Sequence, residues 1–87
     1  MLCVMKVMDE VLAIAQLRAD LASGRARAIR ERAHLSQADV GLALEVPQPT
    51  VARWEAGRMP RREHAARYAR FLRELDQISR AGELAEP

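Results

Sequence analysis

Two prolines in the middle of the chain, Pro47 and Pro49, constrain its fold more than any other feature. Proline disfavours the helical conformation in the residue before it, but it is accepted in the first turn of a helix. A helix that approaches from the N-terminal side must therefore end before Pro47, and a new helix is expected to start between residues 47 and 49. The sequence thus predicts two helices that are joined by a link of about three or four residues.

The outer ends of these two helices carry start and stop signals of their own. Ser36 is a favourable N-cap residue and has Asp39 three residues later. The first helix is therefore expected to begin at Ser36 and to end near Leu44 or Glu45. Gly57 is a natural C′ residue and should end the second helix. Each helix is then about eight residues long, and the pair has the dimensions of a helix-turn-helix.

The rest of the chain also favours helix. Alanine, leucine, arginine and glutamate are abundant, and there is almost no alternating run of β-branched residues. After a break at residues 23–24, a helix is expected from Arg25 to about Ala33, and a final helix is expected from about Arg61. With 87 residues, the chain has room for one small domain. We therefore expect an all-α fold and exclude a large enzyme.

Cysteine usage and hydropathy exclude further classes of protein. Cys3 is the single cysteine, so it cannot form an internal disulfide, and no cluster of cysteine and histidine has metal-ligand spacing. We therefore expect no metal, no cofactor and a reducing cytoplasm. The longest uncharged stretch of the N-terminal region, Val11 to Leu17, is too short for a membrane span, which needs about 20 apolar residues. His34 and His64 lack a set of catalytic partners at a suitable spacing, so no enzyme is expected.

The basic residues are concentrated in the middle of the chain. The whole chain has a formal net charge of +2, but residues 23–73 contain eleven arginines against five acidic residues, a net charge of +6. Residues 1–22 and 74–87 carry net charges of −1 and −3. The planar guanidinium group suits phosphate recognition, although a GC-rich genome produces the same arginine bias without any function. The positions of the arginines must therefore decide between the two interpretations.

The two helices of residues 36–57 divide their side chains between an inward and an outward face. The apolar side chains that can face a common core are Val40, Ala43, Leu44, Val46, Val51 and Trp54. The polar side chains that this arrangement leaves outside are Gln37, Gln48, Thr50, Arg53 and Arg58. Arginine can form a bidentate pair with guanine and glutamine with adenine, whereas threonine hydroxyls and helix N-termini suit phosphates. The outward face is thus suited to read base edges in double-stranded DNA.

A family resemblance becomes visible in residues 28–60, which read AIRERAHLSQADVGLALEVPQPTVARWEAGRMP. This segment resembles the helix-turn-helix domain of the Cro/lambda-repressor, or Xre-type, regulators, and the resemblance covers about residues 25–75. The matching elements are, in order, Arg30-Glu31, Leu35-Ser36-Gln37, Val51, Trp54-Glu55, Gly57 and Pro60. The resemblance implies a compact bundle of four or five helices of the lambda-repressor type that binds operator DNA, commonly as a dimer.

This resemblance divides the chain into three parts. Residues 23–79 are expected to form the helix-turn-helix DNA-binding domain, and residues 1–22 are expected to form an additional N-terminal amphipathic helix. Residues 80–87 are expected to be a frayed acidic tail.

Carried over position by position, the resemblance implies that a recognition helix of about residues 48–56 enters the major groove. The implied DNA contacts are Gln37, Gln48, Pro49, Thr50, Arg53, Arg58, Arg61 and Arg62. Arg53 is expected to read a base, whereas Arg58, in the loop after this helix, is expected to contact phosphate. Arg30 and Glu55 match positions where the family holds a structural ion pair, so we expect them to stabilise the fold and not to bind DNA.

Three residues depart from the family pattern. Glu45 stands where the family usually has glycine in the turn, so a left-handed backbone there would be modestly strained, or the turn would be reshaped. Gly41 stands where the family usually has alanine, which lowers helix propensity by about 1 kcal/mol and allows close helix packing. Pro49 cannot donate a hydrogen bond to a base, although it can contact a thymine methyl group.

The apolar stretch from Val4 to Leu21 lies outside the part of the chain that the resemblance explains. Its polar residues recur at helical spacing and form one narrow stripe, which leaves a wide apolar face that needs cover. One interpretation is an extra helix that packs on the domain's own core. The other is a contact with a second copy or a partner protein, made by Val4, Met8, Val11, Leu12 and Ala15.

We therefore predict a sequence-specific transcriptional regulator, namely a repressor that occupies an operator in the nucleoid of a bacterium or in a phage genome. It is expected to bind an inverted repeat as a homodimer. One alternative is the antitoxin of a toxin–antitoxin pair, which binds its own operator and a toxin protein. The other is a protein-interaction module that has lost DNA binding, for which Glu45 and Pro49 are the only hints.

Overall fold

The computed structural model describes the backbone of residues 2–85 and the side chains of residues 6–82. Within that part, the chain forms five helices and no strand, which confirms the all-α fold. The helices are α1 (Leu2–Ser23), α2 (Arg25–Arg32), α3 (Gln37–Leu44), α4 (Gln48–Glu55) and α5 (Arg62–Ala85). In the described residues, none of these helices combines the length and the apolar character that a membrane span requires.

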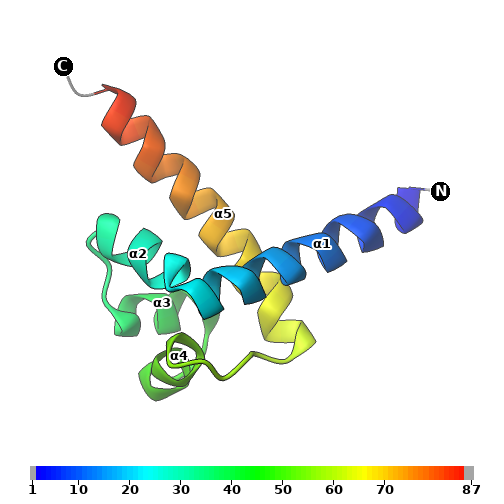
Figure 1. The fold of residues 1–87 in the computed structure, drawn as a ribbon, viewed down its shortest axis with the longest axis horizontal. Helices are drawn as coiled ribbons and strands as arrows, with labels where there is room; N and C mark the ends of the chain where they lie inside the picture. The colour runs from blue at the N-terminus through cyan, green and yellow to red at the C-terminus, as the bar shows by residue number, and fades with distance from the viewer. Residues whose placement is uncertain (1, 86–87) are drawn as a thin grey trace.

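Two long helices, α1 and α5, cross each other and frame the three short ones (Figure 1). The helices α2, α3 and α4 lie together on one side of the crossing, and α4 lies at the end of the molecule opposite to the chain ends. The N-terminal half of α1 and the C-terminal half of α5 project beyond this cluster as two separate arms. A surface formed by α4 is therefore separated in space from both arms.

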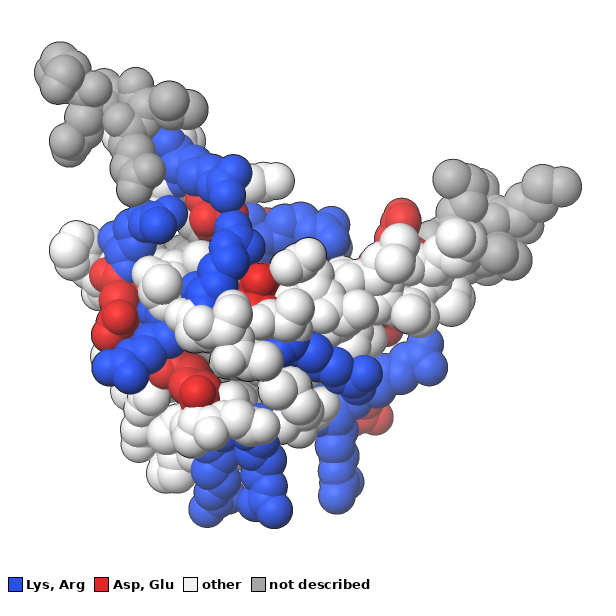
Figure 2. Space-filling model, in the orientation of Figure 1, with Lys and Arg blue, Asp and Glu red and all other residues white. Residues whose placement is uncertain are grey.

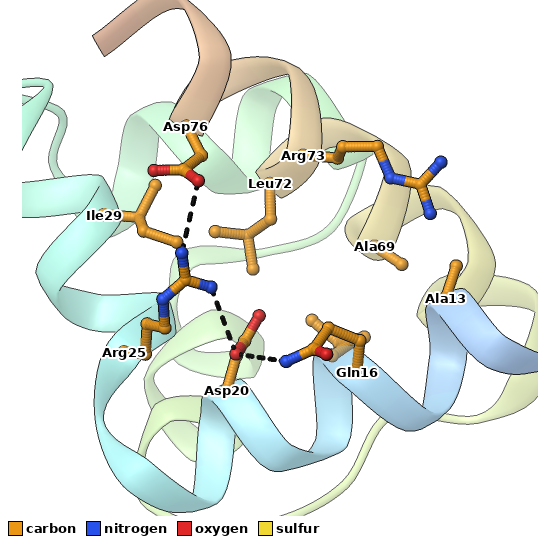
Figure 3. Close-up of a pocket in the computed structure, with 10 residues that line it drawn as sticks. Ala13, Gln16, Asp20, Arg25, Ile29, Ala69, Leu72, Arg73 and Asp76 are labelled. Atoms are coloured by element: carbon orange, nitrogen blue, oxygen red, sulfur yellow. Dashed lines mark hydrogen bonds and ion pairs between the residues drawn. The ribbon is translucent and has the colours of Figure 1, made fainter. Parts of the chain in front are cut away.

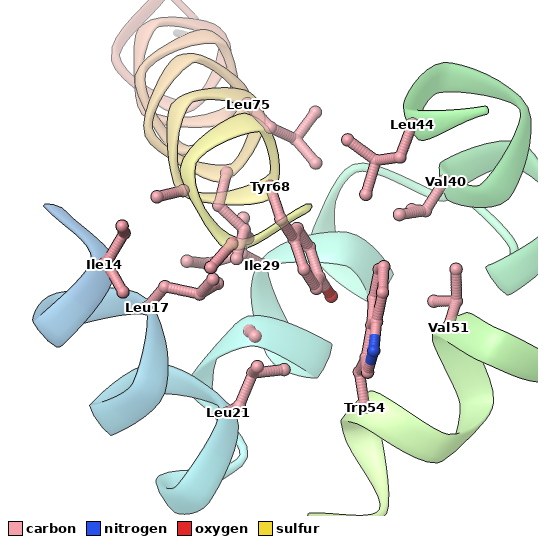
Figure 4. Close-up of a cluster of buried hydrophobic side chains, with 14 residues drawn as sticks. Ile14, Leu17, Leu21, Ile29, Val40, Leu44, Val51, Trp54, Tyr68 and Leu75 are labelled. Carbon is pink, nitrogen blue, oxygen red and sulfur yellow. The ribbon is translucent and has the colours of Figure 1, made fainter. Parts of the chain in front are cut away.

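All five helices contribute side chains to one hydrophobic core (Figure 4). Tyr68 is 1% exposed, and its ring centroid lies 5.5 Å from that of Trp54, which is 5% exposed. Val51 and Leu17 are also almost completely buried. The two aromatic rings lie side by side between α4 and α5, so the prediction that Trp54 belongs to the core is confirmed.

The ends of α3 and α4 follow the start and stop signals in the sequence. The backbone N–H of Asp39 donates a hydrogen bond to Oγ of Ser36 at 3.0 Å, and the N–H of Ser36 donates one to the Asp39 carboxylate at 2.8 Å. This reciprocal pair fixes the start of α3. At the end of α4, Gly57 has a φ of +118°, and the N–H of Arg58 donates to the carbonyl of Arg53, as in a Schellman motif.

The link between α3 and α4 contains a left-handed residue although no glycine stands at that position. Glu45 has a φ of +60°, and the N–H of Val46 donates a hydrogen bond to the carbonyl of Gly41 at 2.9 Å. The turn is therefore not reshaped, and Glu45 carries the strain of a side chain in this conformation, about 1 kcal/mol or more. The carboxylate of Glu45 lies 3.1 Å from Arg67, but this exposed ion pair offsets little of that cost.

Two expectations about individual segments are wrong. Ala43 is exposed and does not face the core. The buried side of α3 runs through Gly41 instead, because the small residue allows the following turn to approach the helix closely. The helix α5 continues to Ala85, so the backbone of residues 80–85 is helical where the sequence predicts a frayed tail. No proline interrupts α5 before Pro87, and the acidic composition of this segment does not prevent helix formation.

The helix α1 divides into a packed half and a projecting half. Three apolar side chains of the C-terminal half are buried in the domain's own core, namely Ile14, Leu17 and Leu21. Four apolar side chains of the N-terminal half remain 49–64% exposed, namely Val7, Met8, Val11 and Leu12. Ala15 is also exposed, and the side chain of Val4 lies outside the described residues. The helix therefore packs on its own domain through only one of its halves.

Gly41→Ala should destabilise the protein strongly, because there is no space for a side chain at this position. A Cβ atom on residue 41 would lie 2.6 Å from the carbonyl oxygen of Val46, a backbone atom that cannot move without opening the turn. We expect a loss of about 2 kcal/mol in the free energy of unfolding, measured by urea denaturation with circular dichroism. Gly82→Ala is the matched control, because a Cβ atom there meets nothing within 4 Å and alanine favours helix. Equal effects of the two substitutions would contradict the close approach of the turn to α3.

Candidate nucleic-acid interface

The helix α4 presents an exposed polar face at the end of the molecule opposite to the two arms. Gln48, Pro49 and Arg53 are exposed, whereas Val51 and Trp54 are buried and fix the rotation of α4 about its axis. Pro49 is the second residue of the helix, where its missing N–H group would have no acceptor within the helix in any case. The N-terminus of α4 thus lies at the surface, where the N–H of Thr50 donates a hydrogen bond to the carbonyl of Pro47 at 3.0 Å.

Four exposed arginines surround this face. Arg53 lies on α4, Arg58 and Arg61 lie in the loop that follows, and Arg62 begins α5. None of these four guanidinium groups forms an ion pair within the part of the chain that the structure describes. Figure 2 shows basic side chains that extend into solvent from this end of the molecule, below α4 and below the start of α5. A polyanion can therefore reach them without displacing an acidic partner.

A buried ion pair joins α2 to α4 beneath the exposed face. Nε and Nη2 of Arg30 donate hydrogen bonds to the two carboxylate oxygens of Glu55 at 2.7 and 2.9 Å. The side chains of Arg30 and Glu55 are only 11% and 5% exposed. Nη1 of Arg30 donates a further hydrogen bond, at 2.9 Å, to the carbonyl of Leu35 in the link before α3. One guanidinium group thus fixes α2, α4 and the approach to α3 relative to one another.

Hydrogen bonds keep the carboxylates of this region ionised. Burial raises the pKa of Glu55, but the hydrogen bonds from Arg30 and Gln37 and the positive charges of Arg30 and Arg27 together lower it by more, so its pKa lies below the usual value. The hydrogen bond to Glu55 raises the pKa of Arg30, and burial opposes this effect only in part. The backbone N–H and then the hydroxyl of Ser36 lower the pKa of Asp39 at the start of α3. The buried pair is therefore fully charged at neutral pH.

Two glutamines extend the polar network from the buried pair to the surface. Nε2 of Gln37 donates a hydrogen bond to Oε1 of Glu55 at 3.0 Å, and Nε2 of Gln48 donates one to Oε1 of Gln37 at 2.7 Å. This series of hydrogen bonds holds the amide group of Gln48 in a defined direction. Oε1 and the second N–H of Gln48 have no hydrogen-bond partner among the described residues. A donor and an acceptor are thus presented together at the first residue of α4.

The structure brings most of the residues named by the family resemblance to one end of the molecule. Two of these residues are less exposed than the others. Thr50 is half-buried, and Gln37 is half-buried and has both ends of its amide engaged within the protein. Gln37 therefore does not project outward in the way that the sequence predicts.

Two contacts of this region were not predicted from the sequence. One is the hydrogen bond from Arg30 to the carbonyl of Leu35, because no sequence pattern marks a backbone acceptor. The contact between Arg67 and the turn was missed because it joins segments that are far apart in the chain.

A second polar cluster lies between α1, α2 and α5 and lines a pocket of about 120 Å³ (Figure 3). Arg25 lies between two carboxylates there, 3.5 Å from Asp20 and 3.2 Å from Asp76. Nε2 of Gln16 donates a hydrogen bond to Asp20 at 3.0 Å. Oδ1 of Asp76 is buried without a hydrogen-bond partner among the described residues. This cluster ties α2 to the two long helices, and no residue of α4 lines it.

Comparison with known protein families identifies the segment that carries these features. A family model described as helix-turn-helix matches residues 27–77, which is more than half of the chain. The matched segment begins in α2, includes α3 and α4, and ends within α5, so it leaves out α1. No curated protein and no solved structure matches the chain.

Acid should destabilise the protein through Glu55. The pKa of Glu55 is lower in the folded chain than in the unfolded chain. The stabilisation that it provides is therefore complete above the unfolded pKa of about 4.3, and it is lost as the pH falls through the lower folded pKa. Urea denaturation of the protein at pH 7 and at a pH near 3.5 should show a lower midpoint in acid.

Two glutamine substitutions assign this effect to its residue. Glu55→Gln should reduce the loss between neutral and acid pH, although not abolish it, because Asp39 still titrates in the same interval. Glu63→Gln is the matched control, because it removes an exposed carboxylate in the first turn of α5 without touching the buried pair, and it should change the pH dependence less than Glu55→Gln does. An unchanged pH dependence in Glu55→Gln would contradict the role of the buried pair.

Proposed function

This chain belongs to the helix-turn-helix family of the Cro/C1 type, and we propose that it is a sequence-specific transcriptional regulator that represses by occupying an operator. Membership of this family makes it a DNA-binding regulator. The observation that carries the finer proposal is the exposed side of α4. It bears the guanidinium group of Arg53 and the amide group of Gln48. The hydrogen bond to Gln37 holds the amide group of Gln48 in place.

We propose that α4 enters the major groove of DNA as the recognition helix. Each base pair presents a distinct pattern of donors and acceptors in this groove, and an α-helix fits into it. The available donor and acceptor of Gln48 match N7 and the N6 amino group of adenine, and the guanidinium of Arg53 matches O6 and N7 of guanine. Each such pair discriminates against the wrong base by about 1–3 kcal/mol. Because Gln37 already restrains Gln48, binding costs this side chain less conformational entropy.

The remaining exposed residues near α4 are proposed to contact the DNA backbone. Arg58, Arg61 and Arg62 extend into solvent around the helix and are suited to phosphate contacts that set its position along the groove. The hydroxyl of Thr50, in the first turn of α4, is suited to a phosphate near the helix N-terminus. Pro49 offers an apolar surface that a thymine methyl group can contact.

We propose that two copies act together on an inverted repeat. One recognition helix contacts only a few base pairs, so a single copy has little specificity. Two copies whose helices lie one turn of DNA apart, about 34 Å, read a longer and rarer site. Occupancy needs only the DNA-binding surface, which is why we favour repression over activation. Such a regulator would reside with bacterial or phage DNA in the cytoplasm.

A second candidate function is that of an antitoxin, which binds its own operator and also a toxin protein. The exposed apolar side chains of the projecting half of α1 favour this candidate, because they lie outside the matched segment. The alternative of an interaction module without DNA binding has less support. Glu45 and Pro49, which suggested it, both lie in ordinary helix-turn-helix geometry.

Selection from a random duplex library tests the proposal directly. The purified chain is incubated with the library at about 150 mM salt, where non-specific binding is weak, and the retained duplexes are sequenced. We expect an enriched inverted repeat with guanine and adenine at the positions that Arg53 and Gln48 face. A folded protein, verified by circular dichroism, that enriches no sequence would overturn the proposal.

Arg53→Ala and Arg58→Ala should affect DNA binding in different ways. Arg53→Ala should relax the preference at one base pair by about 1–3 kcal/mol, because it removes a base contact. Arg58→Ala should weaken binding to all sequences alike and reduce the log–log salt slope by about 1, because it removes a phosphate contact. Fluorescence anisotropy with the selected duplex and its single-base variants, at several salt concentrations, measures both quantities. The same behaviour in the two variants would contradict these roles.

A further inference from the structure

We propose that the projecting half of α1 is the surface through which two copies of this chain pair. The surface, called the α1 patch below, consists of Val7, Met8, Val11 and Leu12. The inference rests on the proposed function in one respect, since the pair would supply the two recognition helices of an inverted repeat. The pairing itself can be measured without DNA.

The α1 patch is a contiguous apolar surface. Its four residues lie on one side of the helix, and their exposed fractions are 49%, 58%, 49% and 64%. Ala15 is also exposed and continues the same stripe by one more turn. Single exposed apolar residues are ordinary, whereas a contiguous group is typical of an interaction site. The visible surface along α1 is largely uncharged in Figure 2.

The rotation of α1 turns its polar side toward the protein and its apolar side away from it. Lys6, Asp9 and Glu10 line a groove whose other wall carries Arg67, Arg70 and Arg73 of α5. A helix that had only its own domain to pack against would bury its apolar side and expose the charges. Here these charged side chains remain exposed but lie on the side of α1 that faces α5, whose wall of the groove carries the three arginines and Glu63. The outward apolar side is thus left for another molecule.

The projecting half of α1 receives little stabilisation from packing on its own domain. Ile14 is its first buried residue among those described, so about three turns of helix precede the core. Most of the stability of a helix in a protein comes from the packing of its apolar side, and the apolar side of this half is exposed. Contacts with a partner along the α1 patch would provide the missing stabilisation.

The spacing of the exposed residues fits a helix as the partner. Met8, Val11 and Ala15 follow the alternating steps of three and four residues that line the seam between paired helices. Val7 and Leu12 flank this seam on its two sides and widen the apolar contact. The α1 helix of a second copy presents the same pattern.

A second copy is favoured over a different protein by charge and by position. The α1 patch contains no charged side chain, so a two-fold axis through it brings no like charges together. Closed two-fold pairs are also the commonest assemblies of identical chains. The arm projects away from α4, so pairing through it leaves both recognition helices accessible (Figure 1).

Sedimentation equilibrium of the whole chain, from low micromolar to several hundred micromolar concentration, tests this pairing. We expect the wild-type chain to be a dimer. The double variant Met8→Glu, Val11→Glu should raise the dimer dissociation constant by at least about 100-fold, because it buries charges in an apolar contact. Glutamate favours helix, so the circular dichroism of the variant should remain that of the wild type.

Ile78→Glu is the matched control, because Ile78 is an apolar side chain on the other arm and is 69% exposed. It should pair as tightly as the wild type. A wild-type chain that is monomeric throughout, and so leaves the α1 patch to another protein, would overturn the proposal. Undiminished pairing of the double variant would also overturn it.

Cysteine cross-linking gives a readout that does not depend on the stability of the double variant. Met8→Cys, Val11→Cys and Leu12→Cys are each combined with Cys3→Ser and exposed to oxidised glutathione. Two thiols from two chains become one disulfide, and the glutathione disulfide is reduced to two thiols. At least one of the three variants should form a disulfide-linked dimer, whereas Ile78→Cys with Cys3→Ser should not. Failure of all three would overturn the proposal.

These outcomes are separate from those of the DNA selection. A chain that pairs through the α1 patch but enriches no duplex would contradict the proposed function and leave the pairing intact. A chain that enriches only single half-sites and stays monomeric would contradict the pairing and leave DNA recognition intact.

Discussion

The buried pair of Arg30 and Glu55 is the interaction on which the position of the recognition surface depends. Removing two charges from water is costly, and their attraction offsets this cost only when the remaining donors and acceptors are satisfied. Here the guanidinium group also binds the carbonyl of Leu35, and the carboxylate also accepts a hydrogen bond from Gln37. An apolar pair of similar volume would stabilise the domain at least as well, but it would lack the directional fork of arginine. The pair therefore contributes the orientation of α4 more than net stability.

The turn before α4 requires a left-handed backbone at residue 45, and this chain has a glutamate there. The N–H of Val46 reaches the carbonyl of Gly41 only if residue 45 is left-handed, so the short link imposes this conformation whatever side chain is present. Glu45 adopts it at a cost in stability, and Gly41 leaves room for the chain to reverse directly over α3. The departure from the family pattern thus lowers stability and leaves the geometry of α4 unchanged, because Glu55 in the buried pair and Trp54 in the core hold α4 independently of the turn.

Signals that act over a few residues were sufficient to predict the bounds of α3 and α4, whereas contacts between distant residues could not be predicted from them. The start of α3 depends on Ser36 and Asp39, which are neighbours in the chain, so the sequence alone locates it. The exposure of Ala43 could not be predicted in this way, because the inward side of so short a helix is decided by the helices packed against it. Gln37 was expected to face outward, but it binds Glu55, which lies 18 positions away. Helical spacing places such a residue on a face but does not identify its partner.

For the N-terminal helix, too, helical spacing predicts a face but not the partner of that face. Its periodicity predicts a wide apolar face but not which part of that face the domain covers. Ile14, Leu17 and Leu21 enter the core, and because α1 is one continuous helix, they also fix the rotation of the turns that precede them. The same helix contacts α2, α4 and α5. A partner bound to the α1 patch would therefore set the position of α4 through rigid packing and not through a flexible linker, so that assembly would determine the spacing at which two recognition helices meet DNA.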